Sequence, residues 1–392
     1  MNPRHLTRAS LLALAFSLAS CGGGGGIGGT GSPMGTLRVA ITDAPSCGYD
    51  AVNVTIEKVR VHQSATATDS DAGWSDIVLS PPRRVDLLSL TNGVLANLGQ
   101  TSLPAGKYTQ LRLVLAPNGS MPPFANSVLP SGGSETALDT PSSQQSGLKL
   151  NADITVPADK VLDVVLDFDA CKSVVKRGNS GQYNLKPVIT VIPILFDAGL
   201  RIVGYVDPAI ATSATAVSAQ ASGVPVKATP PDPTGKFVLY PVPLGTYDLV
   251  VTSPGHVTAV MTGVPVISTA YTYVNSATVP IAPAAAASAP GVVTGALVPA
   301  TATVRALQTF AGGPTVEIQW APVDALTGAF QFTLPVEAPG KTAFAPNPTS
   351  LSFAPDATAA GKYRLEAASG VSTQTLDIDV NAPLPPVTFI FP

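Results

Sequence analysis

Short runs in which apolar and polar residues alternate recur along the first half of the chain. In residues 36–42 the alternation places Leu37, Val39 and Ile41 on one side of an extended backbone. Similar runs follow at 52–56, 111–115, 161–168 and 188–194. A period of two, interrupted by turn residues, is typical of half-buried strands in a β-sandwich. We therefore predict a β-sandwich domain over residues 36–196.

Two segments of this domain depart from the strand pattern. Apolar residues three or four positions apart predict a helix over residues 87–98, although Gly93 lies inside it. Residues 119–147 are rich in Ser, Gly and Pro, which predicts a long loop or an irregular hairpin. Long loops in compact domains often carry function, so this segment is the first place in the chain where we expect a binding surface.

The second half of the chain contains an internal repeat. Gly204 and Gly295 open the two copies, and a Thr-Gly-x-Phe segment follows in each, at 234–237 and 327–330. A Gly-x-Tyr-x-Leu segment comes next, at 245–249 and at 361–365, where a longer insertion precedes it. We interpret the copies as two further β-sandwich domains, residues 200–282 and 291–392, joined by a Pro/Ala linker.

The first residues have the three regions of an export signal. Arg4 and Arg8 form a basic start, and residues 11–18 form an apolar run too short to span a bilayer. The next residues complete Leu-Ala-Ser-Cys, which resembles the lipobox of bacterial lipoproteins. The resemblance implies a signal peptide over 1–20, acylation of Cys21 and a Gly-rich tether over 21–35. The alternative is an ordinary signal peptide with an incidental cysteine.

Export has two consequences for the rest of the chain. Gly22, and not Asp, follows Cys21, and by resemblance to enteric lipoprotein sorting this favours the outer membrane, with the lipid anchor as membrane contact. An exported compartment is oxidising, so the remaining cysteines, Cys47 and Cys171, are expected to form a disulfide. The alternative is a pair of free thiols.

Composition narrows the fold class and the partners. The chain has 392 residues, is 45% hydrophobic and 12% charged, and carries a net charge of −3. It has no basic stripe with interleaved aromatic residues, so we expect no nucleic-acid partner. Its 38 prolines and 35 glycines raise the alternative of disorder, but the alternating runs argue for strands joined by turns. The prediction is an all-β chain of tandem β-sandwich domains.

Two family resemblances support this organisation. Residues 36–196 resemble the bacterial lipoprotein family called domain of unknown function 4382, through TLRVAITDAPSCGYDAVNVTIEKVRVH, LPAGKYTQLRLVL and LDFDACKSVV. That resemblance implies no activity. Residues 200–282 resemble carboxypeptidase-regulatory-like domains, through TGKFVLYPVPLGTYDLVVTSPGH, and residues 291–392 resemble a diverged copy. This second resemblance implies a transthyretin-like sandwich of the kind used as a stalk, a spacer or a carbohydrate-binding-like module.

Candidate catalytic residues are sparse. Only His62 and His256 follow the signal peptide, and they lie in different predicted domains, so a Ser-His-Asp or Cys-His arrangement is hard to build. Ser173 and Lys176 have the S-x-x-K spacing of a lysine-activated serine, but they follow a strand and the accompanying motifs are missing. We expect no catalytic residue, no cofactor and no enzymatic activity.

Clustered carboxylates are the only candidates for a metal site. Asp163, Asp167 and Asp169 are separated by even steps and therefore share one strand face, with Asp43 as a possible fourth member. Such a cluster can bind calcium. The favoured interpretation is a solvated or hydrogen-bonded face without a metal.

These observations favour a lipid-anchored cell-envelope protein with a non-enzymatic binding, adhesion or structural role. The alternative is carbohydrate binding through the transthyretin-like domains. The partner would then be a glycan or another envelope protein. Glycan binding predicts exposed aromatic side chains in a concave patch, and burial of both Trp74 and Trp320 would weaken it.

Overall fold

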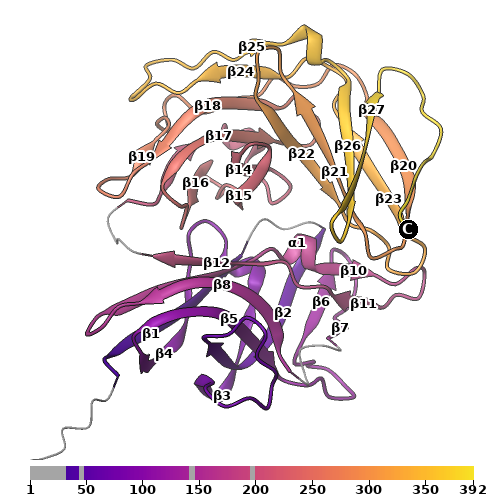
Figure 1. Ribbon diagram of the computed structural model, residues 1–392. Coiled ribbons are helices and arrows are strands. Elements are labelled where there is room, and N and C mark those ends of the chain that lie inside the picture. The colour runs from indigo at the N-terminus through magenta and orange to yellow at the C-terminus, as the bar shows by residue number, and fades with distance from the viewer. Residues whose placement is uncertain (1–31, 44–47, 141–145, 195–198) are drawn as a thin grey trace, which may run out of the picture. The chain divides into compact units, whose positions relative to one another are not determined.

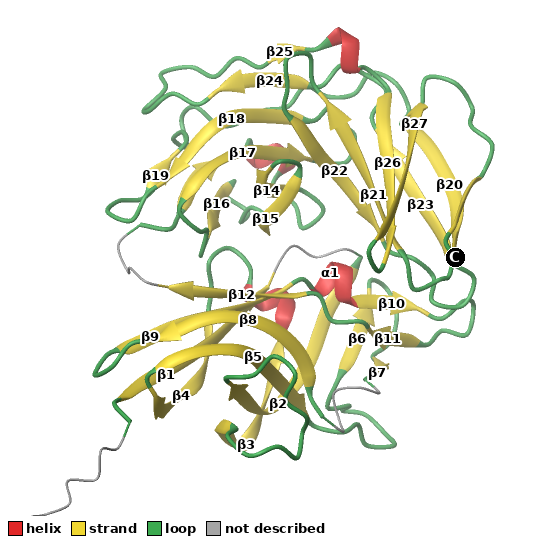
Figure 2. Cartoon of the chain, viewed as in Figure 1, coloured by secondary structure: helices red, strands yellow, loops and turns green. Residues whose placement is uncertain are grey.

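The computed structural model describes residues 32–43, 48–140, 146–194 and 199–392. The chain divides into two compact units, residues 1–32 and 33–392. The predicted signal peptide, Cys21 and Cys47 lie outside the described residues. Figure 2 shows that strands dominate and that helices are few and short, which confirms the all-β prediction. Within the described residues no helix combines the length and the apolar character that crossing a membrane requires.

The first domain is a sandwich of two sheets around one core (Figure 1). The strands of one sheet, in spatial order, are β12 (Ile189–Ile194), β9 (Val161–Phe168), β1 (Met34–Asp43) and β4 (Ala96–Pro104). The other sheet runs in the order β10 (Val174–Lys176), β11 (Tyr183–Leu185), β7 (Thr136–Asp139), β6 (Ser127–Pro130), β2 (Tyr49–His62), β5 (Gly106–Leu115) and β8 (Leu148–Val156), with β3 (Ser75–Asp86) also paired to β2.

The predicted alternation places side chains as expected in this domain. Leu37, Val39 and Ile41 of β1 are fully buried in the core, where they face Leu111 and Leu113 of β5 within the same cluster. Strands β1 and β9 run parallel, and Asp43 at the end of β1 is paired with Phe168 at the end of β9. The last residues of these two strands therefore lie next to each other.

The predicted helix over residues 87–98 is wrong. Only Leu87–Leu90 are helical, as the 3₁₀ helix η1, and β4 begins at Ala96. Asn92 and Gly93 have positive φ values of 58° and 80°, and this left-handed turn ends the helix. The predicted loop over 119–147 contains the short antiparallel pair β6 and β7, and thus the irregular hairpin that was the alternative there.

The second domain pairs a small sheet with a larger one. The small sheet has the order β16 (Lys236–Leu239), β13 (Ile202–Tyr205) and β19 (Thr272–Tyr273). The larger sheet has the order β15 (Val224–Thr229), β14 (Ala216–Ala221), β17 (Gly245–Thr252), β18 (Ala259–Val266), β24 (Gly340–Ala343) and β25 (Ala354–Pro355). The short helices that accompany the three domains are α1 (Ala170–Ser173), η2 (Pro208–Ile210) and η3 (Ala357–Ala359).

The third domain repeats this topology. Its small sheet has the order β23 (Ala329–Leu334), β20 (Gly291–Val298) and β28 (Val387–Ile390). Its larger sheet has the order β22 (Thr315–Ala321), β21 (Thr303–Thr309), β26 (Lys362–Ser369) and β27 (Ser372–Asp379). In both domains the central strand of the small sheet pairs antiparallel with one neighbour and parallel with the other. The sequence repeat is therefore also a repeat of strand order.

Residues 291–392 do not form a separate domain, because the insertion in the second copy contributes strands to a sheet of the second domain. Strands β24 and β25 come from this insertion, yet β24 pairs in parallel with β18 of the second domain. The pairing covers the edge that β18 would otherwise expose. The second and third domains are thus joined by a shared sheet as well as by the linker.

Each domain contains a tyrosine whose hydroxyl donates a hydrogen bond to a proline carbonyl. The three tyrosines belong to Gly-x-Tyr segments, and the arrangement resembles the tyrosine corner of other sandwiches. The pairs are Tyr108 with Pro104 at 2.8 Å, Tyr247 with Pro243 at 2.8 Å, and Tyr363 with Pro335 at 2.6 Å. The third pair spans the insertion, so the contact is kept although the sequence spacing is not.

The opening glycines of the repeat allow a phenylalanine to pack against the backbone. A Cβ atom added to Gly204 would lie 2.5 Å from the ring of Phe237, and one added to Gly295 would lie 2.4 Å from the ring of Phe330. Both phenylalanines belong to the Thr-Gly-x-Phe segments and are buried. The two motifs of the repeat thus form one packing contact in each domain.

We predict that Gly204→Ala destabilises the protein because its new methyl group overlaps the Phe237 ring. The free energy of unfolding in urea should fall by about 1–3 kcal/mol. Gly119→Ala is the control, since its added Cβ would lie 3.8 Å from the nearest atom and its φ is ordinary. Equal unfolding curves for the two variants would contradict this packing.

Candidate functional site

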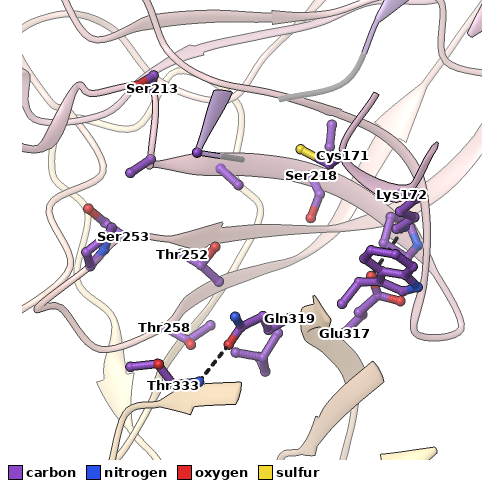
Figure 3. Close-up of a pocket in the computed structure, with 18 of the residues that line it drawn as sticks. Cys171, Lys172, Ser213, Ser218, Thr252, Ser253, Thr258, Glu317, Gln319 and Thr333 are labelled. Atoms are coloured by element: carbon purple, nitrogen blue, oxygen red, sulfur yellow. Dashed lines mark hydrogen bonds and ion pairs between the residues drawn. The ribbon is translucent and has the colours of Figure 1, made fainter. Parts of the chain in front are cut away.

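A cavity of about 770 Å³ lies where residues of all three domains meet. The first domain contributes the end of β9 and helix α1, the second contributes β14, β15 and the turn between β17 and β18, and the third contributes β22 and β23. Figure 3 shows side chains from these separate segments facing the same space. The cavity is therefore a product of the tertiary fold and not of any single motif.

Neutral polar side chains line part of this cavity, whose wall is otherwise mainly apolar. Hydroxyl and carboxamide groups project from the second and third domains, and the labelled ones in Figure 3 are Ser213, Ser218, Thr252, Ser253, Thr258, Gln319 and Thr333. The Gln319 Oε1 accepts a hydrogen bond from the Thr333 backbone N–H at 3.2 Å, which orients its amide group. These groups can exchange hydrogen bonds with a ligand in both directions.

Thr258 stands out among them. Its side chain is only 2% exposed, and its Oγ1 atom has no hydrogen-bond partner in the part of the chain that the structure describes. A buried hydroxyl without a partner costs about 1–3 kcal/mol. Thr258 therefore leaves a hydrogen-bonding group unsatisfied in the wall of the cavity.

The two tryptophans have different roles. Trp320 on β22 lines the cavity and is half-buried. Trp74 lies elsewhere, with the guanidinium groups of Arg60 and Arg112 each 4.7 Å from its ring centroid and its Nε1–H bonded to the Thr68 carbonyl at 2.9 Å. Neither indole is fully buried, and Trp320 and Tyr49 are aromatic side chains in the lining of the cavity.

Three of the charged side chains at the cavity are paired with one another. The Lys172 Nζ lies 3.5 Å from Glu317 (both labelled in Figure 3) and 3.5 Å from Asp169, and Glu317 also contacts Arg305 at 3.3 Å. Burial alone lowers the pKa of Lys172, but Glu317 and Asp169 raise it more, so its pKa lies above the ordinary value. Lys172 is thus a charged, paired group and no candidate nucleophile at neutral pH.

The two calcium candidates near α1 accept hydrogen bonds from backbone N–H groups. Asp43 Oδ1 accepts a hydrogen bond from the Ala170 N–H at 2.9 Å, and Asp169 caps α1 by accepting one from the Lys172 N–H at 2.9 Å. Asp169 therefore lies beyond the strand and not on its face. In physical terms both carboxylates compensate backbone donors at the start of a helix.

The candidates on β9 form ion pairs. Asp163 binds Arg38 through both oxygens, with Arg38 Nη2 at 2.7 Å from Oδ2, and Asp167 binds Lys227. No group of three or more His, Cys, Asp or Glu side chains that could hold a metal ion occurs among the described residues. Each of the four aspartates thus has its own backbone or side-chain partner.

The remaining sequence candidates do not come together. His62 contacts the Ser64 and Ala72 backbone at the end of β2, whereas His256 lies in a turn at the cavity. The Ser173 hydroxyl donates to the Asp169 carbonyl at 2.6 Å and accepts from the Val188 N–H at 2.8 Å, which leaves it unsuited to act as a nucleophile. Cys171 lines the cavity, but its pairing with Cys47 stays a prediction because Cys47 is outside the described residues.

Residues 34–187 match the family model described as "Domain of unknown function (DUF4382)". No curated protein matches the chain. Two solved complexes of type II cohesin with X-dockerin from Acetivibrio cellulolyticus, an N-terminal and a C-terminal interface mutant, are 21% and 24% identical. In each case the match covers 23% of this chain and 61% of the other, with a TM-score of 0.20, which is too low to carry an argument.

A buried ion pair joins the DUF4382 domain to the second domain at the cavity. Lys227 on β15 is 1% exposed at its side chain and Asp167 on β9 is 9% exposed. Lys227 Nζ also donates to the Asp43 carbonyl at 3.1 Å. Burial raises the pKa of Asp167 and Lys227 opposes this, with a net shift upward. Both residues line or adjoin the cavity, so this pair fixes one of its walls.

We predict that Lys227→Met destabilises the protein by about 3–5 kcal/mol, because it leaves the Asp167 charge buried without a partner. The double variant Lys227→Met with Asp167→Leu should recover most of this loss. Lys107→Met is the matched control, since Lys107 and Asp153 pair at 2.9 Å with 60% and 80% of their side chains exposed. Its effect should stay within about 1 kcal/mol in urea unfolding.

Acid should relieve the defect of Lys227→Met. Below the ordinary aspartate pKa of about 3.9, Asp167 is neutral in both the folded and the unfolded chain, and no buried charge remains. Burial raises the folded-state pKa, so above about pH 3.9 the unfolded chain loses this proton while folded Asp167 keeps it, and the penalty grows with pH until it levels off above the folded-state pKa. Unfolding of the variant at about pH 4 and about pH 7 tests this sign. An equal loss of stability at both pH values would rule out the buried charge as its cause.

Proposed function

We propose that this protein is a lipid-anchored component of the cell envelope, in the outer membrane, that binds a ligand without changing it chemically. The lipobox-like Leu-Ala-Ser-Cys segment and the Gly-rich tether after Cys21 support the anchor. The DUF4382 match is consistent with this proposal and assigns no chemistry. The paired state of Lys172 and the bonded Ser173 hydroxyl support a binding role over a catalytic one.

We extend the proposal to a disulfide between Cys47 and Cys171. Their segments follow β1 and β9, whose last residues Asp43 and Phe168 are register partners. The Asp43 carboxylate also accepts the Ala170 N–H, one residue before Cys171. A disulfide here would connect the ends of two neighbouring parallel strands in an oxidising compartment.

The ligand that the cavity suits best is a short neutral saccharide. The unpartnered buried hydroxyl of Thr258 is the observation that carries this proposal. Around it, hydroxyl and carboxamide groups match the mixed donors and acceptors of sugar hydroxyls, and Trp320 offers an apolar ring to the C–H face of a sugar. The volume of about 770 Å³ lies within the range of small-molecule sites.

We predict that the chain binds one of three neutral probes, namely malto-, cello- or chitooligosaccharides, in isothermal titration calorimetry. Trp320→Ala should weaken that binding about tenfold by removing the stacking surface. Thr258→Val, which keeps the shape and removes the hydroxyl, should weaken it about fivefold or more. Leu326→Ala is the control, since Leu326 is exposed and does not line the cavity. Failure of all three probes, or unchanged affinity of Trp320→Ala, would overturn the saccharide assignment.

Intact-mass analysis of the membrane fraction tests the anchor. We expect a chain that begins at Cys21 with two or three acyl chains, and two thiols that react only after reduction. Cys21→Ser should move the protein to the soluble fraction, because a single cysteine carries the anchor. Cys171→Ser is the control and should stay in the membrane fraction. An unlipidated wild-type protein would remove the envelope assignment.

A further inference from the structure

The two faces of the small sheet in the second domain carry different side chains. Register pairs Val203 of β13 with Val238 of β16 and with Tyr273 of β19, and it pairs Tyr205 with Lys236. Since side chains alternate along a strand, these residues share one face. The residues between them, such as Phe237 and Leu239, are buried in the core. The outward face is therefore a defined row of side chains and not an extension of the core.

This face forms a shallow groove of about 410 Å³ that is rich in tyrosine. Tyr205, Tyr271 and Tyr273 line it together with Arg201 and Lys236. Tyr271 and Tyr273 are 41% and 53% exposed, and their ring centroids lie 6.3 Å apart. The groove thus presents flat aromatic surfaces and two cationic groups to solvent.

The groove is preorganised. The Arg201 guanidinium lies 4.0 Å from the ring centroid of the buried Tyr240 and 4.8 Å from that of Tyr271, and it donates a hydrogen bond to the Tyr271 hydroxyl. Asn92 of the DUF4382 domain accepts the Val238 N–H at 2.6 Å and thereby supports the outer strand β16. Fixed rings and a fixed cation lower the entropic cost of binding.

No carboxylate among the described residues pairs with the positive charge in the groove. None of the described residues that line the groove is acidic. Neither Arg201 nor Lys236 forms an ion pair with a carboxylate in the described ranges, although the whole chain has a net charge of −3. Two unpaired cations beside stacking surfaces suit an anionic ligand.

The third domain shows that the fold does not require these residues. In both repeats the opening glycine is paired in register with a phenylalanine. The residue pair that follows it along the strands is Tyr205 with Lys236 in the second domain, but Ala296 with Ala329 in the third. The equivalent face of the third domain also exposes Ile390. One repeat thus carries aromatic and cationic groups where the other carries small or aliphatic ones.

We propose that this groove is a second binding site, specific for an acidic oligosaccharide such as a uronic-acid polymer. The tyrosine rings stack on the C–H faces of successive sugars, and Arg201 and Lys236 bind the carboxylates. An acidic peptide suits the site less well, because extended peptides add to a free strand edge whereas the groove lies on a sheet face. The proposal is independent of saccharide binding in the cavity.

Calorimetry of the full-length protein in detergent with an oligogalacturonate tests this site, and a maltooligosaccharide of the same length is the neutral comparison. We expect Tyr273→Ala to weaken oligogalacturonate binding about tenfold. Lys236→Gln should weaken it and reduce its salt dependence. Ile390→Ala on the equivalent face of the third domain, and Trp320→Ala in the cavity, should leave it unchanged.

Absence of oligogalacturonate binding would overturn the proposal, as would unchanged affinity in both Tyr273→Ala and Lys236→Gln. Stronger binding of polyglutamate than of oligogalacturonate would assign the groove to acidic peptides instead. If Tyr273→Ala fails to fold in urea unfolding controls, the Lys236→Gln change, at a half-buried position, decides alone. Loss of oligogalacturonate binding in Trp320→Ala, with Tyr273→Ala unaffected, would place the acidic ligand in the cavity and refute the groove.

Discussion

The buried ion pair between Lys227 and Asp167 is the interaction on which the arrangement of the described domains depends. Moving two charges out of water is costly, so the pair is stable only with close geometry and further hydrogen bonds. The Asp43 carbonyl supplies such a bond to Lys227. Asn92 adds neutral hydrogen bonds from the DUF4382 domain to β16 of the second domain. The cavity wall and the support of the tyrosine groove both follow from this junction.

The second and third domains are joined by hydrogen bonds and strand pairing, without a buried ion pair of this kind among the described residues. The buried Gln220 side chain exchanges two hydrogen bonds of 2.8 Å with the backbone of Glu317, and β24 extends the sheet of the second domain. The repeat thus supplies one scaffold twice, with glycine and phenylalanine packed alike in each copy. Differences between the copies lie on the surface, where one small sheet carries tyrosine and the other does not. Duplication of a scaffold with divergence of its outer face is a simple route to two binding surfaces.

The sequence predicted the fold best where a residue pattern has a single structural explanation. Alternation in residues 36–42 predicted the buried face of β1, and the repeated glycines predicted a shared topology. The helix over 87–98 was wrong because apolar spacing says nothing about the left-handed turn at Asn92 and Gly93. Even spacing correctly grouped Asp163 and Asp167 on one face of β9 but wrongly included Asp169, which caps α1, and it did not indicate the partners Arg38 and Lys227, which lie far away in sequence. The cavity was missed because residues of three separate domains, far apart in the sequence, form it.

The proposed saccharide site combines residues from all three domains. Hydrogen exchange of the full-length protein, with and without the neutral oligosaccharide that binds it, is its most direct test. We expect slower exchange at residues 252–258 of the second domain and 317–322 of the third, with no change at 271–273. Protection confined to one domain, or protection only at 271–273, would contradict it.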